Sequence, residues 1–260
     1  MREKQQSNQL KKRADQYNDP QHNYLRYWDE RRYEHLSEEI AIKKFLKNKL
    51  FKLALDVGGG YGRLDILLSK YADSVILAEP SQQQLDLSAD FLKNYPQVKR
   101  ILMQADDLDF DDNSIDLVLL IRVLHHLPDP YNELSEINRV LKTNGYAIIE
   151  VANYAHFRNR IKYLLKRQKL PSEPVDIRSE ANRIKDEIAF VNHNPHTIIR
   201  KFQVAGFDVV DVLSVSNLRS PTIKKYLPVY LMLAIERFLQ KPLARFYFGP
   251  SLFFLLRKTS

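Results

Sequence analysis

The chain has 260 residues, of which 44% are hydrophobic, 28% charged and 11% aromatic, and it contains no cysteine. This composition excludes a disordered chain, and the lack of cysteine excludes a disulfide framework, cysteine-ligated zinc, iron–sulfur clusters and a cysteine nucleophile. The net charge of +8 is uneven, with +4 on residues 1–50, −7 on residues 51–150 and +11 on residues 151–260. An acidic middle between basic flanks does not favour a nucleic-acid coat protein.

The two ends of the chain give no targeting or membrane signal. The N-terminal sequence MREKQQSNQLKKR lacks the apolar core of a signal peptide. The most apolar stretch, residues 226–256, is interrupted by Glu236, Arg237 and Pro242, and a membrane span needs about 20 consecutive apolar residues. We therefore expect a cytoplasmic protein without a transmembrane segment.

Residues 1–50 predict a polar arm followed by a helix. Residues 1–23 are rich in Lys, Gln and Asn, which indicates a mobile arm, and an aromatic cluster with arginines follows from residue 24. The segment HLSEEIAIKKFLKNKL then predicts an amphipathic helix with Ser37 as its N-cap. Its predicted apolar face contains Leu36, Ile40, Phe45 and Leu46.

From residue 51 the pattern alternates between strands and helices. Apolar runs predict strands at residues 51–57, 74–79, 98–104, 115–121 and 146–152. Amphipathic segments between them predict helices at residues 62–72, 81–94 and 130–142, with Ser81 as an N-cap. This alternation predicts an α/β fold with a doubly wound, mostly parallel sheet.

After residue 153 the alternation loosens. We expect a basic amphipathic helix at 156–169, a loop or lid at 170–188 and a helix at 196–206 that ends at Gly206. Strands follow at 207–215 and 251–258, with a helical insertion at 222–247 between them. The predicted domains are an N-terminal arm and helix (1–50) and an α/β domain (51–260). That domain comprises a core (51–155) and helical elaborations at 156–206 and 216–248.

A glycine cluster follows the first predicted strand in the segment Leu55-Asp56-Val57-Gly58-Gly59-Gly60-Tyr61-Gly62. Glycines allow a tight turn and a close approach of the backbone to a ligand, and the next helix presents its N-terminus there. Dinucleotide-binding loops use G-x-G-x-x-G, but Arg63 stands where their third glycine would be. Asp56 would repel a pyrophosphate, whereas it suits a ligand with an ammonium group.

The segment ALDVGGGYGR resembles motif I of the class I S-adenosylmethionine-dependent methyltransferases, an acidic residue followed by G-x-G-x-G. The resemblance covers residues 50–155 and continues weakly through HTIIRKFQVAGF. It implies a Rossmann-like seven-stranded sheet with six parallel strands and one antiparallel strand, and S-adenosyl-L-methionine as cofactor.

The resemblance also implies the cofactor contacts. Glu79 would bind the ribose hydroxyls, and Asp106 with Asp107 would hold the adenine amino group. Other cofactor residues are predicted in the glycine loop, after the second and fourth strands, and in the arm: Asp56, Gly58, Gly59, Gly60, Gly62, Pro80, Arg122, Tyr24 and Arg32. Tyr24, Tyr27 or Tyr33 would cover the site, and an arginine of the arm would reach the cofactor's carboxylate. The alternative is a helix on the sheet edge with solvated arginines. No metal site is predicted.

The acceptor is less defined. His125 and His126 follow the fourth strand, so either is a candidate general base, and a purely structural role is the alternative for His126. The loop HHLPDP is similar to the branch with quinone, lipid and small-metabolite methyltransferases, so we expect a small-molecule or lipid-like acceptor. The basic C-terminal helices predict contact with an anionic surface such as a membrane, or only a solvated basic face. Alternatives for the whole chain are a non-catalytic cofactor- or partner-binding protein, an NAD-type dehydrogenase or an RNA methyltransferase.

Overall fold

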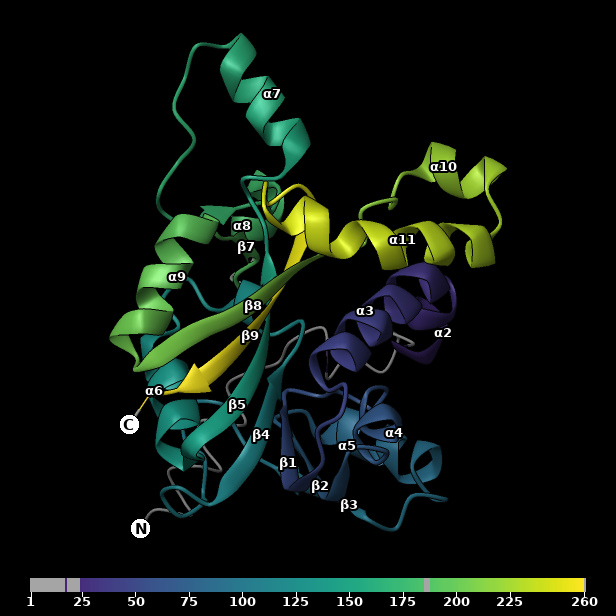
Figure 1. Cartoon of the computed structure of the whole chain (residues 1–260), viewed down its shortest axis with the longest axis vertical. Coiled ribbons are helices and arrows are strands. Elements are labelled where there is room, and N and C mark those ends of the chain that lie inside the picture. The colour runs from purple at the N-terminus through teal and green to yellow at the C-terminus, as the bar shows by residue number, and fades with distance from the viewer. Residues whose placement is uncertain (1–16, 18–23, 185–187, 260) are drawn as a thin grey trace.

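A computed structural model describes Tyr17, residues 24–184 and residues 188–259. The main sheet is built from β1 (Phe51–Val57), β2 (Ala72–Glu79), β3 (Val98–Leu102), β4 (Ile115–Leu120), β5 (Leu141–Ala152), β8 (Phe207–Val215) and β9 (Ser251–Lys258). These strands lie in the order β3-β2-β1-β4-β5-β9-β8 (Figure 1). β9 is antiparallel to both of its neighbours, and the remaining pairs are parallel. The predicted sheet with one antiparallel strand is therefore confirmed.

Helices cover both faces of the sheet, as a doubly wound fold requires. One face carries α3 (Arg32–Phe45), α4 (Asp65–Leu68) and α5 (Gln82–Phe91), whose apolar side chains form a core with alternate residues of the strands. The other carries α6 (Tyr131–Val140) and α9 (Pro195–Val204) over a second core. The strands are apolar on both sides because each side packs against helices.

Two predicted details of the helices are wrong. The helix expected at 62–72 is only the single turn α4, because Gly62 has a left-handed φ of +86° and the chain turns repeatedly up to β2. Ser37 is not an N-cap. It lies buried inside α3, which begins at Arg32, and its hydroxyl donates to the carbonyl of Tyr33 at 2.7 Å. Ser81, in contrast, caps α5 as predicted, since its side chain accepts from the Gln84 N–H.

The C-terminal part adds elements around the carboxyl edge of the sheet. Its further helices are α7 (Phe157–Leu165), α8 (Glu180–Ile184), α10 (Pro221–Tyr226) and α11 (Val229–Ala244), and the short helix α2 (Tyr24–Asp29) precedes α3 at the other end of the chain. A small antiparallel pair, β6 (Val175–Asp176) and β7 (Val191–Asn192), lies within the expected loop 170–188 and just beyond it. Among the described helices none has the length and apolar content to span a membrane. The arm predicted at residues 1–23 lies outside the described residues, apart from Tyr17.

The N-terminal helix α3 and the C-terminal helix α11 pack together on the sheet (Figure 1). The Tyr33 hydroxyl donates to Oε2 of the buried Glu236 at 2.7 Å, and the Gln240 side chain donates to the carbonyl of Ser37 at 2.9 Å. Burial raises the pKa of Glu236 although Tyr33 and the Asn217 N–H donate to it. These contacts join two ends of the chain and hold α3 beside the carboxyl ends of the strands.

Candidate active site

A cavity of about 970 Å³ opens at the carboxyl ends of β1, β2, β4 and β5. The sheet order reverses between β1 and β4, and ligands of open α/β sheets bind at such a switch point. Loops after these strands form one side of the cavity, while Tyr17, α2 and the start of α3 form another. The segment before β7 and the start of α10 close the remainder.

The glycine loop after β1 presents backbone to this cavity. Gly58 and Gly60 have left-handed φ values of +68° and +63°, which glycine adopts without the strain that a Cβ brings. A Cβ at Gly58 would lie 2.5 Å from Cγ2 of Val123, so this glycine allows β1 and the loop after β4 to approach. A Cβ at Gly60 would meet no atom closer than 3.9 Å, so the Gly60 backbone lies open to a ligand.

Asp56 is a buried carboxylate in the cavity wall. Its Oδ2 has no hydrogen-bond partner among the described residues. Burial raises the pKa of Asp56 to about 7, although the positive charge of Arg63 opposes this shift. An unpartnered buried carboxylate is costly unless a cation or a donor meets it, so the site fits a ligand that carries an ammonium group. This is the ligand chemistry that the sequence predicts for Asp56.

Glu79, at the end of β2, is held by backbone donors. The Gly60 N–H donates to Oε2 at 2.8 Å and the Ser81 N–H donates to Oε1 at 2.9 Å. A carboxylate has about four acceptor positions, so such a group can bind backbone N–H donors and hydroxyl groups of a ligand together. The glycine loop and Glu79 are therefore held in one arrangement at the cavity wall.

The structure brings most of the predicted cofactor residues to the cavity but not all. Those in its lining are Asp56, Gly58, Gly59, Gly60, Glu79, Pro80, Asp106, Arg122 and Tyr24. Gly62, Asp107 and Arg32 do not line it. Gly62 turns the chain against Leu92, and Arg32 is exposed at the first turn of α3, so its neighbour Arg31 is the arginine at the cavity.

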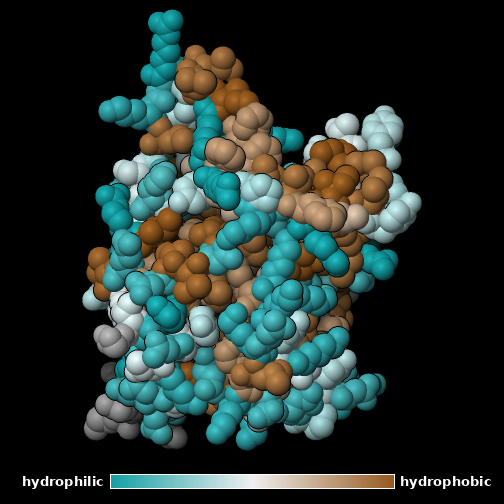
Figure 2. Space-filling view, viewed as in Figure 1, coloured by the Kyte–Doolittle hydropathy of each residue, from teal (hydrophilic) through white to brown (hydrophobic). Residues whose placement is uncertain are grey.

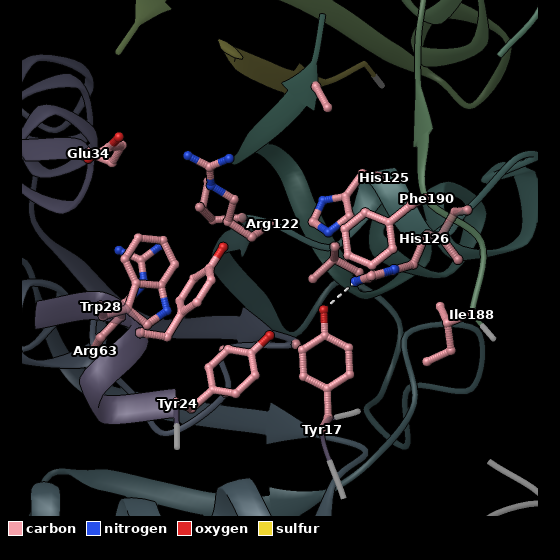
Figure 3. A pocket seen from close by; sticks show the side chains of 18 of the residues that line it. Tyr17, Tyr24, Trp28, Glu34, Arg63, Arg122, His125, His126, Ile188 and Phe190 are labelled. Atoms are coloured by element: carbon pink, nitrogen blue, oxygen red, sulfur yellow. Dashed lines mark hydrogen bonds between the residues drawn. The ribbon is translucent and has the colours of Figure 1, made fainter. Parts of the chain in front are cut away.

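Sequence reasoning missed a buried glutamate that joins two of these loops. Glu38 of α3 is buried, and its Oε2 accepts from Arg63 of the glycine loop at 2.5 Å. Its Oε1 accepts from Nε and Nη2 of Arg122 at 2.8 and 2.5 Å. The guanidinium of Arg63 also stacks 3.6 Å from the centre of the Trp28 ring (Figure 3). Arg122, predicted as a cofactor contact, thus lines the cavity while being paired to Glu38.

The signal for Glu38 was present in the spacing. The buried side of α3 comprises two rows at intervals of four residues: Tyr33, Ser37, Ala41 and Phe45, and Glu34, Glu38 and Ile42. The predicted face was rotated from this, because Leu36 and Ile40 are only half-buried. A prediction based only on apolar side chains places Glu34 and Glu38 on the exposed side of the helix. In the structure both lie on the side that packs against the rest of the protein.

Hydrogen bonds to two described residues orient His126, and Figure 3 shows the one to Tyr17. Its Nδ1 lies 2.9 Å from the carbonyl oxygen of Ala189, and a carbonyl only accepts, so Nδ1 carries the proton. Its Nε2 lies 2.5 Å from the hydroxyl oxygen of Tyr17. When the ring is neutral, Nε2 accepts a hydrogen bond from this hydroxyl group. The carbonyl of Tyr17 in turn accepts from the Ser81 hydroxyl at 2.9 Å.

His125 has a different environment. Its ring stacks near those of His126 and Phe190, at centroid distances of 4.0 and 4.8 Å. Burial, reinforced by the neighbouring His126 and Arg122, holds the pKa of His125 well below its usual range. His125 is therefore neutral near pH 7 and a weak base, so the two predicted candidates are not equivalent.

The acceptor side of the cavity has a more apolar lining. Its lining residues next to the β6–β7 pair are Ile177, Ile188, Ala189 and Phe190, and the Phe190 ring contacts those of His125 and His126. Further along, Arg219 and Lys224 reach the cavity, and Lys224 is paired with the buried Glu34 at 2.6 Å. Within the described residues no cluster of His, Asp and Glu has the arrangement of a metal site.

Comparison with known proteins agrees with this geometry. Residues 55–149 match the family model described as a methyltransferase domain. Among curated relatives, an uncharacterised protein of Methanocaldococcus jannaschii is 34% identical over 130 residues, covering 50% of this chain and 52% of that protein. A demethylmenaquinone methyltransferase of Staphylococcus carnosus is 34% identical over 110 residues, covering 41% and 46%. The aligned part thus spans about half the length of these relatives.

Solved structures extend the likeness over almost the whole fold. An S-adenosylmethionine-dependent methyltransferase of Thermotoga maritima superposes with a TM-score of 0.60 at 18% identity, covering 91% of this chain and 94% of that one. The [4+2]-cyclase SpnF superposes with a TM-score of 0.57 at 17% identity, covering 87% and 81%. At this identity the structures show the fold, and the family model locates the matching motifs within it. Residues 55–149 therefore form a methyltransferase domain, in a fold shared with class I S-adenosylmethionine-dependent methyltransferases, and this likeness implies S-adenosylmethionine as the cofactor.

Proposed function

We propose that the chain is an enzyme that transfers a methyl group from S-adenosylmethionine to a small-molecule or lipid-like acceptor by in-line displacement. The observation that carries this proposal is the buried Asp56 carboxylate, whose Oδ2 has no partner in the described chain although it lies in the cavity wall. A carboxylate in this position is unfavourable in the free protein and favourable beside an ammonium group. The names of the matched relatives support methyl transfer as the reaction.

Different residues of the chain would bind different groups of the cofactor. Asp56 would bind the ammonium group, Glu79 the ribose hydroxyls and Asp106 the adenine amino group, while the open backbone at Gly60 lies against the cofactor. When bound, S-adenosylmethionine supplies a methyl group on a sulfonium centre. The protein's task is then to orient the acceptor atom in line with that group and to exclude water.

The acceptor side favours an apolar, lipid-like molecule with one polar reacting group. Its wall is formed by Ile177, Ile188 and Phe190, and the two histidines lie beside that wall. The relative from Staphylococcus carnosus is named a demethylmenaquinone methyltransferase, which supports an apolar acceptor of the quinone kind. Small apolar ligands occupy such cavities with a few polar contacts that fix their orientation.

We assign proton removal from the acceptor to the Tyr17–His126 pair. The Tyr17 oxygen would take the acceptor's proton while the Tyr17 proton moves to Nε2 of His126, which becomes doubly protonated. His126 is oriented for this by its Nδ1–H bond to Ala189, as the base of a catalytic pair is oriented by a third group. His125 would pack against the acceptor and Phe190 without taking the proton.

A binding protein without catalysis, or a different reaction on this fold, is the competing function. SpnF, a cyclase by its name, has the same fold, so the fold by itself does not determine the reaction. A dehydrogenase is disfavoured because Asp56 and Arg63 replace the features of a pyrophosphate loop.

Calorimetry with S-adenosylhomocysteine, and separately with NAD, tests the cofactor part. We expect the wild-type chain to bind S-adenosylhomocysteine but not NAD, and Asp56→Asn to weaken binding about tenfold or more. Asp73→Asn, which removes an exposed carboxylate at the start of β2, is the matched control and should bind normally. Binding of NAD, or of neither ligand, would contradict the proposed cofactor.

The acceptor is then sought by incubating the enzyme with fractionated metabolite and lipid extracts and measuring S-adenosylhomocysteine release. Release that requires a fraction identifies a methyl acceptor. Tight cofactor binding without release from any fraction would favour the non-catalytic alternative.

A further inference from the structure

Helix α7 projects from the molecule with a mostly exposed apolar side (Figures 1 and 2). At its start the Phe157 ring stacks on that of Phe248 at a centroid distance of 4.9 Å. None of the residues of α7 is buried. Leu164 and Leu165 at its end are 75% and 79% exposed, and Phe157 and Ile161 are exposed as well. Single exposed apolar residues are common on protein surfaces, but four on one short helix indicate a contact surface.

The same helix has a strong positive charge. The segment 156–169 contains six Lys and Arg residues and no acidic residue: Arg158, Arg160, Lys162, Lys166, Arg167 and Lys169. None of these six forms an ion pair with the residues that the structure describes. The positive charges are therefore not compensated within that part of the protein.

A second projection has a similar character. Tyr226 at the end of α10 and Tyr230 at the start of α11 are 72% and 75% exposed, and Lys225 lies over the Tyr226 ring at 5.6 Å. In Figure 2 hydrophobic surface is visible at both projections, on α7 and on the α10–α11 corner.

Both projections border the mouth of the active-site cavity. α7 follows the carboxyl end of β5, and α10 follows the carboxyl end of β8, which runs parallel to β5. His156, the residue preceding α7, and both Pro221 and Lys224 of α10 are part of the cavity lining. A flat partner that touches both helices would therefore face the acceptor entrance.

We propose that this edge of the molecule docks onto an anionic lipid bilayer, with α7 lying in the membrane interface. An interfacial helix combines Lys and Arg with exposed apolar side chains, which is the composition of α7. A nucleic acid would use the positive charges but not Leu164 and Leu165, because its backbone is recognised by charge. The docking places a lipid-like acceptor next to the cavity, and only this consequence rests on the proposed function.

Vesicle flotation with the whole purified chain tests the docking without any cofactor or acceptor. Vesicles of phosphatidylcholine alone are compared with vesicles containing phosphatidylglycerol, at low and at physiological salt. We expect binding to the anionic vesicles only. Lys162→Glu/Lys166→Glu should reduce the partition coefficient about 25-fold or more, since each basic residue near an anionic surface contributes about fivefold. Leu164→Ser/Leu165→Ser should reduce it about tenfold or more.

Matched controls lie at the other end of the strands, around the start of β1. Leu50→Ser removes an apolar side chain that is 83% exposed just before β1, and Lys47→Glu/Lys52→Glu makes the same change in charge as the α7 variant. Both controls should bind like the wild-type chain. Since α7 has no buried residue, thermal unfolding of its variants should be unchanged.

Three results would overturn the proposal. The first is no binding to anionic vesicles at low salt. The second is an equal loss of binding in the α7 variants and the controls, which indicates a general charge effect. The third is binding of short single-stranded RNA that depends on the lysines but not on the leucines, without vesicle binding. Calorimetry with S-adenosylhomocysteine is independent of each of these results, so failure of the docking and failure of the proposed function are distinguishable.

Discussion

Arg122 donates from Nε and Nη2 to Oε1 of Glu38, a residue 84 positions earlier in the chain, at 2.8 and 2.5 Å. Arg122 has a left-handed φ of +63°, which is uncommon for a residue with a side chain. The double hydrogen bond fixes the loop after β4 against α3, and Arg63 fixes the glycine loop to the same carboxylate. Three segments that line the cavity therefore depend on one buried glutamate.

We expect Glu38→Ala to destabilise the protein by about 3–5 kcal/mol, because it leaves two guanidinium groups without their buried partner. Glu39→Ala, on the same helix, loses a half-exposed pair with Lys43 and should cost less than about 1 kcal/mol. Urea unfolding of the two variants measures both values. Equal stabilities would contradict a special role for Glu38.

The lowered pKa of Glu38 should make the stability of the folded protein depend on pH in the acid range. Burial would raise the pKa of Glu38, but the charges of Arg122 and Arg63 outweigh burial and lower it. A lowered pKa contributes stability that is present above the carboxyl's ordinary pKa and is lost as the pH falls through the folded-state pKa. We expect thermal stability to fall below about pH 4.5, with a shallower fall in Glu38→Gln.

For Asp56 we expect the opposite dependence of stability on pH. Its pKa is raised to about 7 in the folded protein, so its contribution to stability is fully present below its ordinary pKa of 3.8 and is lost as the pH rises to 7. Asp56→Asn should therefore stabilise the ligand-free protein near pH 8 by up to about 4 kcal/mol, and not at pH 4. Thermal unfolding at the two pH values is the measurement, and an equal effect at both would contradict the raised pKa.

Ligand binding should follow the same titration. If the ionised Asp56 binds the ammonium group, the affinity for S-adenosylhomocysteine should increase about tenfold between pH 5.5 and pH 7.5. Asp56→Asn should remove this dependence while keeping weak binding. A wild-type affinity that is constant over this range would show that Asp56 does not contact the ligand's charge.

The two glycines Gly60 and Gly62 should separate binding from folding. Gly60→Ala places a methyl group where no described atom lies within 3.9 Å, so it should cost only about 1–2 kcal/mol of stability for its left-handed φ but weaken S-adenosylhomocysteine binding more than tenfold. Gly62→Ala, whose Cβ would lie 2.5 Å from Cδ1 of Leu92, should cost about 2–4 kcal/mol. Urea unfolding and calorimetry on both variants test this contrast, which a reversed order would contradict.

The intrinsic fluorescence of Trp28 should report ligand binding in the cavity. It is the chain's one tryptophan, it lines the cavity and it stacks on Arg63. S-adenosylhomocysteine should change the intrinsic fluorescence in a saturable titration, with the same dissociation constant as in calorimetry. The change should be absent in Trp28→Phe, which should still bind the ligand in calorimetry. An unchanged wild-type emission at saturation would place the ligand elsewhere.

The strands follow from local signals in the sequence. β1, β8 and β9 begin and end at the predicted residues, and β2, β3 and β4 differ by one or two residues, whereas β5 begins at Leu141, five residues before the predicted start. Apolar runs and the glycine cluster are local signals, and local signals specify strands and their loops. Asp56, Gly58, Gly60 and Glu79 were predicted as cofactor residues from the resemblance to motif I, and each lies at or just after a strand end that the apolar runs predict.

The way in which distant segments complete the site depends on long-range packing and was visible only in the tertiary structure. It brought Glu38 between Arg63 and Arg122, joined Tyr17 to His126, and moved Arg32 away from the cavity while placing Arg31 there. It also showed that no residue of α7 is buried, although its amphipathic pattern matches that of helices that pack in a core. Whether a polar or apolar face finds a partner depends on long-range packing, which residue spacing along the chain does not contain.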